Sequence, residues 1–144
     1  MQAMFKLLTV LLILLCGSVA FGQEEEAAEG DEVAPTTAYF ALKPAFVVNY
    51  GGVGRLRYLK TAITLRVKTG GGANGMAQVR HHLPYIRHTL VMLLSQQTDE
   101  QMSSMEGREL LRQSALAAVR ELLIEEEGEE FIVDLLFDSF IVQR

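Results

Sequence analysis

The sequence predicts an α+β domain in which a small mixed sheet of about three to four strands packs against two main helices. Between residues 79 and 125, large apolar residues recur every three or four positions, which is typical of amphipathic helices. Residues 56–68 alternate apolar and polar side chains, and residues 131–142 are an almost continuous apolar run; both patterns are typical of strands. Because one-sided helices are unstable alone, they are expected to bury their apolar faces on this sheet.

Residues 1–22 are expected to be a signal peptide or an N-terminal membrane anchor. The almost uncharged run at residues 7–22 is shorter than the roughly 20 residues of a membrane-spanning helix. Ala20 and Gly22 occupy the −3 and −1 positions of a signal-peptidase site before Gln23, which favours cleavage. Without cleavage, the first five residues would lengthen the run into an anchor in the inner membrane. A lipid-modified Cys16 is a third alternative, disfavoured by the bulky residue before it.

Residues 23–37 are predicted to form an acidic disordered linker, because they contain few large apolar groups. Six of the 18 acidic residues lie between positions 24 and 32, and the remaining 12 nearly balance the 13 lysines and arginines. The folded domain, assigned to residues 38–144, is therefore close to neutral, which argues against nucleic-acid binding. Cys16 is the only cysteine, so an intrachain disulfide and a cysteine-based metal cluster are both excluded.

The first two strands are expected at residues 39–50 and 56–68, with a glycine turn between them. Pro44 cannot donate to a strand ladder, so the first strand should lie at an edge or contain a bulge. Phe40, Leu42, Phe46 and Val48 of the first strand share one parity. In the second strand Leu59, Ile63, Leu65 and Val67 alternate with polar residues, so one face should pack on the helices and the other should meet water or a partner.

Two helices joined by a short polar break are predicted to follow the glycine-rich loop at residues 69–75. Pro84 fits the first turn of a helix, where its missing N–H costs nothing. Ser103 and Glu106 fit a capping box at the start of the second helix, and Gly128 fits its end. The predicted buried faces consist of Val79, Leu83, Ile86, Leu90, Leu93 and Leu94, and of Leu111, Ala115, Ala118, Val119 and Leu122.

Residues 131–142 are predicted to form the last strand. Large apolar residues occupy both alternating positions, so this strand should be central in the sheet or covered on both faces. Since burying each such side chain contributes roughly 1.5–3 kcal/mol, removal of the last twelve residues should unfold the domain.

No catalytic, cofactor or metal site is predicted. His81 and His88 share a helix face, but seven residues of helix separate them by about 10 Å, which is too far for one zinc ion. His82 points in another direction. The glycine-rich loop lacks the Gly-Lys-Ser/Thr sequence that follows a phosphate-binding loop. The three histidines are therefore interpreted as surface or capping residues.

Several short motifs occur in order along the predicted domain. They lie at residues 39–49, 57–60, 82–88, 93–95, 106–112 and 140–143. In this order they resemble the family of the flagellar basal body-associated protein FliL, over residues 39–143. The resemblance implies a periplasmic domain with a stomatin-type (SPFH-like) fold, no enzymatic activity and no cofactor. It implies structural or assembly roles for Pro44, Tyr58, Pro84, Arg87, Ser95, Glu106, Gly107, Arg112, Phe140 and Gln143.

The resemblance also implies partners. Family members assemble as rings around the stator units of the flagellar motor and support torque or stator engagement. The implied partners are further copies of the chain, the MotA/MotB stator and, if the leader is uncleaved, the inner membrane. The short leader departs from the family pattern and leaves open a paralogue released from the membrane. A general periplasmic scaffold or binding protein unrelated to motility is the alternative function, and an envelope hydrolase that uses the histidines is a third.

Overall fold

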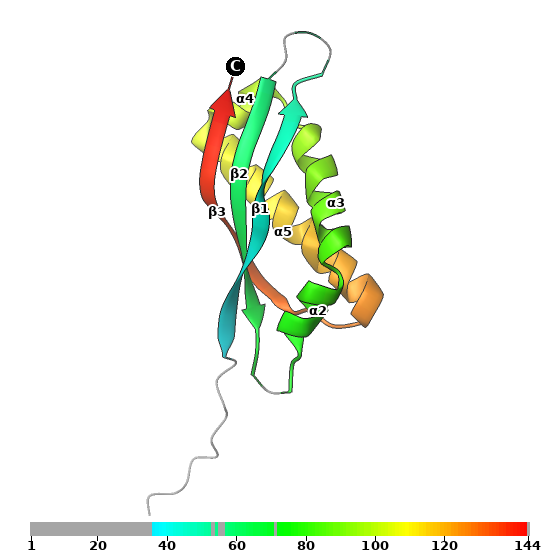
Figure 1. Cartoon of the computed structure of the whole chain (residues 1–144). Coiled ribbons are helices and arrows are strands. Elements are labelled where there is room, and N and C mark those ends of the chain that lie inside the picture. The colour runs from blue at the N-terminus through cyan, green and yellow to red at the C-terminus, as the bar shows by residue number, and fades with distance from the viewer. Residues whose placement is uncertain (1–35, 53, 55–56, 71, 144) are drawn as a thin grey trace, which may run out of the picture. The chain divides into compact units, whose positions relative to one another are not determined.

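A computed structural model describes residues 36–52, 54, 57–70 and 72–143 of the chain. The predicted leader at residues 1–22 and most of the predicted linker lie outside the described residues. Three strands form a sheet in the order β1-β2-β3, with bounds Thr37–Tyr50, Arg57–Lys68 and Ile132–Gln143. Both pairs of strands are antiparallel. The sheet is therefore antiparallel and not the mixed sheet that was predicted from the sequence. The α+β class itself is confirmed (Figure 1).

The central strand is β2, and its residues alternate between buried and partly exposed positions along most of its length, as predicted. The strand β1 lies at one edge. Its pairing with β2 shifts between Leu42 and Phe46, around Pro44, whose peptide bond to Lys43 is cis. Both residues that flank the shift are buried. The proline therefore lies in an edge strand and in a bulge, so both of the positions predicted for a residue without an N–H are confirmed.

The prediction that the last strand is central was wrong, because β3 forms the other edge. Two register shifts in its pairing with β2 explain the error. Each leaves one β3 residue without a partner and moves the inward-facing side chains to the other parity. The inward positions are Ile132, Leu135, Phe137, Phe140 and Val142. The inward apolar residues therefore come from both parities, whereas Leu136 and Ile141 lie on the outer face and are exposed.

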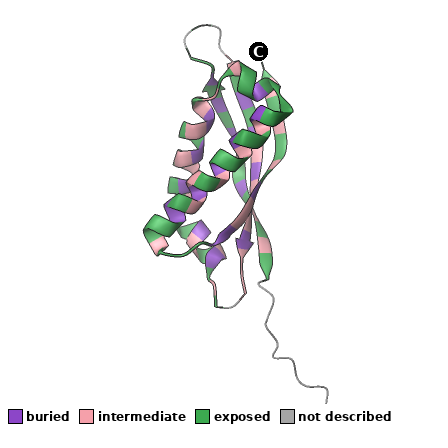
Figure 2. Cartoon of the chain, turned by 180° about the vertical axis from the view of Figure 1, so that it is seen from behind, coloured by how far each residue is buried: buried purple, intermediate pink, exposed green. Residues whose placement is uncertain are grey.

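In the described part of the chain, four helices lie on one face of the sheet. They are α2 (Gly75–His81), α3 (Leu83–Ser95), α4 (Asp99–Ser103) and α5 (Met105–Glu127). Figure 2 shows the helices in front of the sheet, with their buried residues on the sides that face it. The first predicted helix is divided into α2 and α3 at His82, because Pro84 has no N–H to donate to the carbonyl oxygen of Arg80 and its ring would clash with that carbonyl in a continuous helix. Pro84 lies in the first turn of α3, as predicted.

The predicted capping box at Ser103 was also wrong. Ser104 caps α5, and its hydroxyl oxygen accepts from the backbone N–H of Gly107 at 2.9 Å. Ser103 belongs to α4 and donates to the carbonyl oxygen of Asp99. A capping box of the predicted type opens α4 instead, between Thr98 and Gln101. Gly128 ends α5 in the left-handed conformation (φ 76°), as predicted.

One hydrophobic core lies between the sheet and the helices. Its fully buried large side chains come from β1, β2 and β3 and from the helices α3, α4 and α5. They are Phe46, Leu42, Leu59, Ile63, Leu65, Ile86, Leu90, Leu94, Met102, Leu123, Ile132 and Leu135. Val79 of α2 is buried as well. The opposite face of the sheet has no helix on it among the described residues (Figure 1).

Candidate functional site

Arg112 joins α5 to the edge strand β3. Its Nε and Nη2 atoms donate to the carboxylate of Glu109 at 2.8 and 2.6 Å. Its Nη1 atom donates to Asp134 Oδ1 at 2.5 Å and to the carbonyl oxygen of Leu135 at 3.2 Å. The bond to Glu109 raises the pKa of Arg112 above its ordinary value. In turn, the hydrogen bonds from Arg112, followed by that from Gln113, lower the pKa of Glu109 from 4.5 to about 2.

A second arginine of α5 repeats this contact with the edge strand. Arg120 donates from Nε to the carbonyl oxygen of Ile132 at 2.9 Å and from Nη2 to that of Val133 at 2.7 Å. It also pairs with Glu130 at 2.9 Å. An open strand edge invites pairing with other chains, and the two arginines bind three carbonyl oxygens near the start of β3, those of Ile132, Val133 and Leu135. Arg120 was not predicted from the sequence, although Arg112 and Arg120 lie eight residues apart on nearly the same side of α5.

We expect the Glu109→Gln variant to be less stable than the parent chain at pH 7, because it loses a carboxylate that pairs with Arg112. The folded-state pKa of Glu109 is depressed, so its contribution to stability is present above pH 4.5 and is lost as the pH falls toward about 2. The difference between the two melting temperatures should therefore shrink over that pH range. Glu109 is half exposed, so added salt should also reduce the difference.

Thermal unfolding followed by circular dichroism measures this effect. Glu126→Gln is the matched control, since Glu126 is exposed at the other end of α5 and has no ion pair among the described residues. Equal destabilisation of both variants at every pH would contradict the assigned role of the Glu109–Arg112 pair.

Arg87 and Pro44 join α3 to the other edge strand. The Nη1 atom of Arg87 donates to the carbonyl oxygen of Pro44 at 2.8 Å. The guanidinium also lies over the ring of Phe46, with Cζ 4.3 Å from the ring centroid. Both contacts hold the bulge of β1 against α3, so these two motif residues meet although they are 43 positions apart.

Gly107 lies at the corner where α4 turns into α5. It is buried, and a Cβ atom there would lie 2.8 Å from both the carbonyl carbon and the Cα of Gln101. Arg108 supports the same corner by donating from Nε to the carbonyl oxygen of Met102 at 3.1 Å. Its guanidinium also approaches the ring of Phe140, with Cζ 5.1 Å from the centroid. Gly107 is therefore required by close backbone packing.

The other motif residues do not converge on one place. Pro84 opens α3, and Ser95 donates to the carbonyl oxygen of Val91 near the end of that helix. Tyr58 and Gln143 are paired neighbours at one end of the sheet, and both are exposed. Glu106 is exposed in the first turn of α5. The motif thus marks several contacts between helices and sheet rather than one reaction centre.

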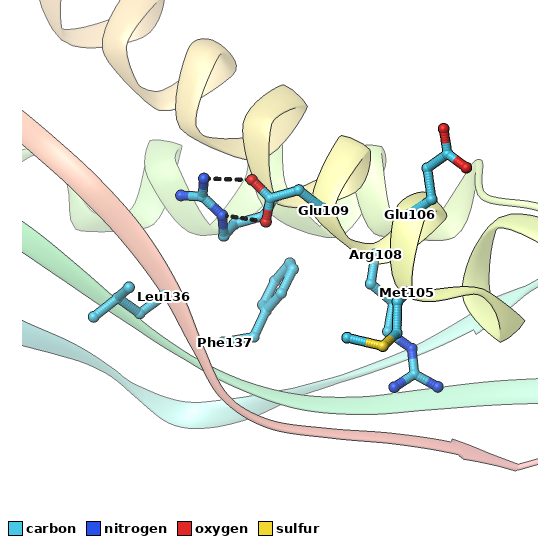
Figure 3. Close-up of a pocket in the computed structure, with 7 residues that line it drawn as sticks. Met105, Glu106, Arg108, Glu109, Leu136 and Phe137 are labelled. Atoms are coloured by element: carbon cyan, nitrogen blue, oxygen red, sulfur yellow. Dashed lines mark hydrogen bonds and ion pairs between the residues drawn. The ribbon is translucent and has the colours of Figure 1, made fainter.

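A groove runs between the start of α5 and β3 (Figure 3). Its volume is about 650 Å³. The lining residues are Met105, Glu106, Arg108, Glu109, Arg112, Leu136 and Phe137. Figure 3 shows the Glu109 carboxylate bonded within the groove; its partner is Arg112. Because most of the charged groups are engaged in these contacts, the groove offers an apolar docking surface more than a site for acid–base chemistry.

The three histidines do not gather around one point. His82 lies between α2 and α3 and contacts Glu127 at the end of α5, with 2.5 Å between Nε2 and Oε1. The ring of His81 meets that of His82 edge to face at 4.7 Å, and His88 is exposed. No group of three histidine, cysteine or acidic residues in the described part of the chain is arranged to hold a metal ion. The pair with Glu127 also gives one of the acids at the end of α5 a structural partner.

Within the ranges that the structure describes, no helix combines the length and the apolar character needed to cross a membrane.

Comparison with known proteins identifies the family. The family model for the flagellar basal body-associated protein FliL matches residues 39–143. The chain is 24% identical to the flagellar protein FliL of Escherichia coli K12 over 143 residues, which cover 95% of this chain and 89% of that protein. It is 29% identical to the flagellar protein FliL of Aquifex aeolicus over 104 residues, which cover 72% of this chain and 60% of that protein. The family match spans all of β1 to β3 except the first two residues of β1, and the chain belongs to the family of the flagellar basal body-associated protein FliL.

Proposed function

We propose that this chain is a non-catalytic accessory protein of the flagellar basal body that self-assembles near the stator and supports torque or stator engagement. The observation that carries the proposal is the family match over residues 39–143, which includes nearly every described residue. The contacts of Arg87 and Arg112 are consistent with it. Both arginines hold helices on the sheet through backbone carbonyls, as expected of a rigid assembly module.

The proposed location is the periplasm, with the MotA/MotB stator and further copies of the chain as partners. The leader-like residues 1–22 support this location by their sequence. Mass spectrometry of the native protein distinguishes the two modes of attachment. A mass that begins at Gln23 indicates a secreted protein, and a mass that begins at Met1 indicates an anchored protein.

We expect deletion of the gene to impair swimming or swarming under load while flagella are still assembled. The physical reason is that a stator accessory affects torque after the filament has been built. Swimming speed in media of increasing viscosity, together with electron microscopy of filaments, measures the effect. Normal motility in a deletion strain that has no second FliL gene would contradict the proposal and favour a general envelope scaffold.

A further inference from the structure

We propose that copies of this chain join by packing the outward face of α5 of one copy on the bare face of the sheet of the next. The inference rests on the self-assembly proposed above and identifies the two surfaces that would carry it. Both surfaces are defined by described residues, and they lie on opposite sides of the domain (Figures 1 and 2). They cannot meet within one copy, so their mutual fit requires a second copy.

The first surface is the outer face of the sheet, which no described helix covers. Cross-strand pairing places Val47, Lys60 and Ile141 in one row on this face. Val47 and Ile141 are 64% and 56% exposed. The next row contains Tyr58, which is 39% exposed, between Asn49 and Gln143. Exposed aliphatic and aromatic side chains in adjacent rows form a patch suited to a protein partner.

The charge of this face is positive. Its central strand presents Lys60, Arg66 and Lys68, which alternate with the buried positions of β2. The Nε atom of Arg66 is buried and has no hydrogen-bond partner among the described residues. Of the nearby acids, Asp134 is paired with Arg112, whereas Asp138 keeps its charge and accepts a hydrogen bond from Thr64, so the three cations exceed the acids that Arg112 does not pair. The face therefore favours an acidic partner.

The second surface is the outward stripe of α5, which has the opposite charge. Exposed residues recur along it at helical spacing: Glu106, Leu110, Gln113, Ser114, Ala117, Glu121, Ile124 and Glu125. The stripe contains three carboxylates and no lysine or arginine. Its two large apolar side chains, Leu110 and Ile124, are 57% and 46% exposed. The arginines of α5 are partly buried and contact the β3 region instead.

The two surfaces also match in length and shape. A helix of 23 residues is about 34 Å long, and a strand of 12 residues is about 40 Å long. Small residues in the middle of the α5 stripe allow close approach to a sheet. Such packing would cover the second face of each sheet with a helix, which is a common layer arrangement. Because the surfaces differ, the contact is head-to-tail; it gives a ring where the rotation from one copy to the next closes, and an open filament where it does not.

Charge reversal tests the interface in the full chain. Lys60→Glu with Lys68→Glu reverses the sheet face, and Glu121→Lys with Glu125→Lys reverses the helix face. We expect each double variant to weaken self-association at least about tenfold, since like charges then oppose each other. Combining all four changes in one chain should restore association, because the charges are again complementary. Sedimentation of the purified full chain in mild detergent measures association, and circular dichroism checks that each variant folds.

Cross-linking tests the same contact by position. Ala62 lies in the middle of β2 on the outer face, and Ala117 lies in the middle of the α5 stripe. In a Cys16→Ser background, Ala62→Cys combined with Ala117→Cys should give a ladder of multimers with a short thiol cross-linker. Each single-cysteine variant should give none. Ala117→Cys combined with Tyr85→Cys is the control, because both positions lie on the helical side.

The outcomes separate this inference from the proposed function. Rescue by the fourfold variant, together with the ladder, supports the interface. A chain that assembles but shows neither charge dependence nor the ladder overturns this interface and leaves self-assembly standing. A chain that stays monomeric at every concentration overturns both.

Discussion

Removal of residues 133–144 is expected to leave a chain with no cooperative unfolding transition. The deletion takes away Leu135, which is fully buried, and Phe137, Phe140 and Val142, which pack on the core. Burial of one large apolar side chain contributes roughly 1.5–3 kcal/mol, whereas a domain is stable by only about 5–15 kcal/mol in total. The remaining sheet would be a two-stranded hairpin, which is marginal even before the exposed core is considered.

Loss of the strand also removes partners from α5. Arg112 loses both Asp134 and the carbonyl oxygen of Leu135, and Arg120 loses that of Val133. The partly buried guanidinium groups would then lack their acceptors. Thermal unfolding and the far-ultraviolet circular dichroism spectrum of the chain that lacks residues 133–144 measure this loss of cooperative structure.

A shorter deletion is the control for this truncation. Removing only residues 143–144 takes away the exposed Gln143 and leaves the inward-facing side chains of β3 in place. This variant should melt close to the parent chain. A sharp, native-like transition in the twelve-residue truncation would show that β3 is dispensable for the core.

The strands illustrate how far alternation in the sequence predicts a fold. The extra residues at the register shifts lie in β1 and β3 and not in β2, so the buried positions Leu59, Ile63 and Leu65 of β2 follow one parity and were predicted correctly. In β3 two unpaired residues change the parity, and the same reasoning placed the strand in the centre of the sheet. A bulge depends on pairing with a distant strand, so a local pattern of apolar residues does not reveal it.

The helix boundaries were ambiguous for a different reason. Thr98 with Gln101 and Ser103 with Glu106 both match the pattern of a capping box, and only the first pair forms one. Choosing between them requires knowing that a short helix fits in the apparent break. The contacts of Arg112 were equally hidden, because Asp134 lies 22 residues away and is aligned only by the packing of α5 on β3. Arg112 itself was selected through its family motif, whereas its acceptors come from the fold.

Gly107→Ala is expected to destabilise the chain by about 1–3 kcal/mol, the usual range for overpacking. Helix propensity alone predicts the opposite sign, since alanine is better than glycine in a helix by up to about 1 kcal/mol. At this position, however, the added Cβ overlaps the backbone of Gln101, including its carbonyl oxygen. Backbone atoms cannot move aside as a flexible side chain can, so α4 and α5 would have to separate. That movement would also disturb the cap that Ser104 provides to the N–H of Gly107.

Chemical denaturation of the full chain measures the change, and Gly128→Ala is the matched control. Nothing lies within 4 Å of a Cβ at Gly128, whose φ is +76°. Its substitution should therefore cost only the backbone penalty of about 1–2 kcal/mol for a left-handed residue. Replacing Gly107 with the larger valine should increase the loss beyond that of alanine, because its methyl groups also meet the backbone of Gln101. If Gly107→Ala stabilised the chain, helix propensity would outweigh the close approach of α4, and the corner would be looser than the contact with Gln101 implies.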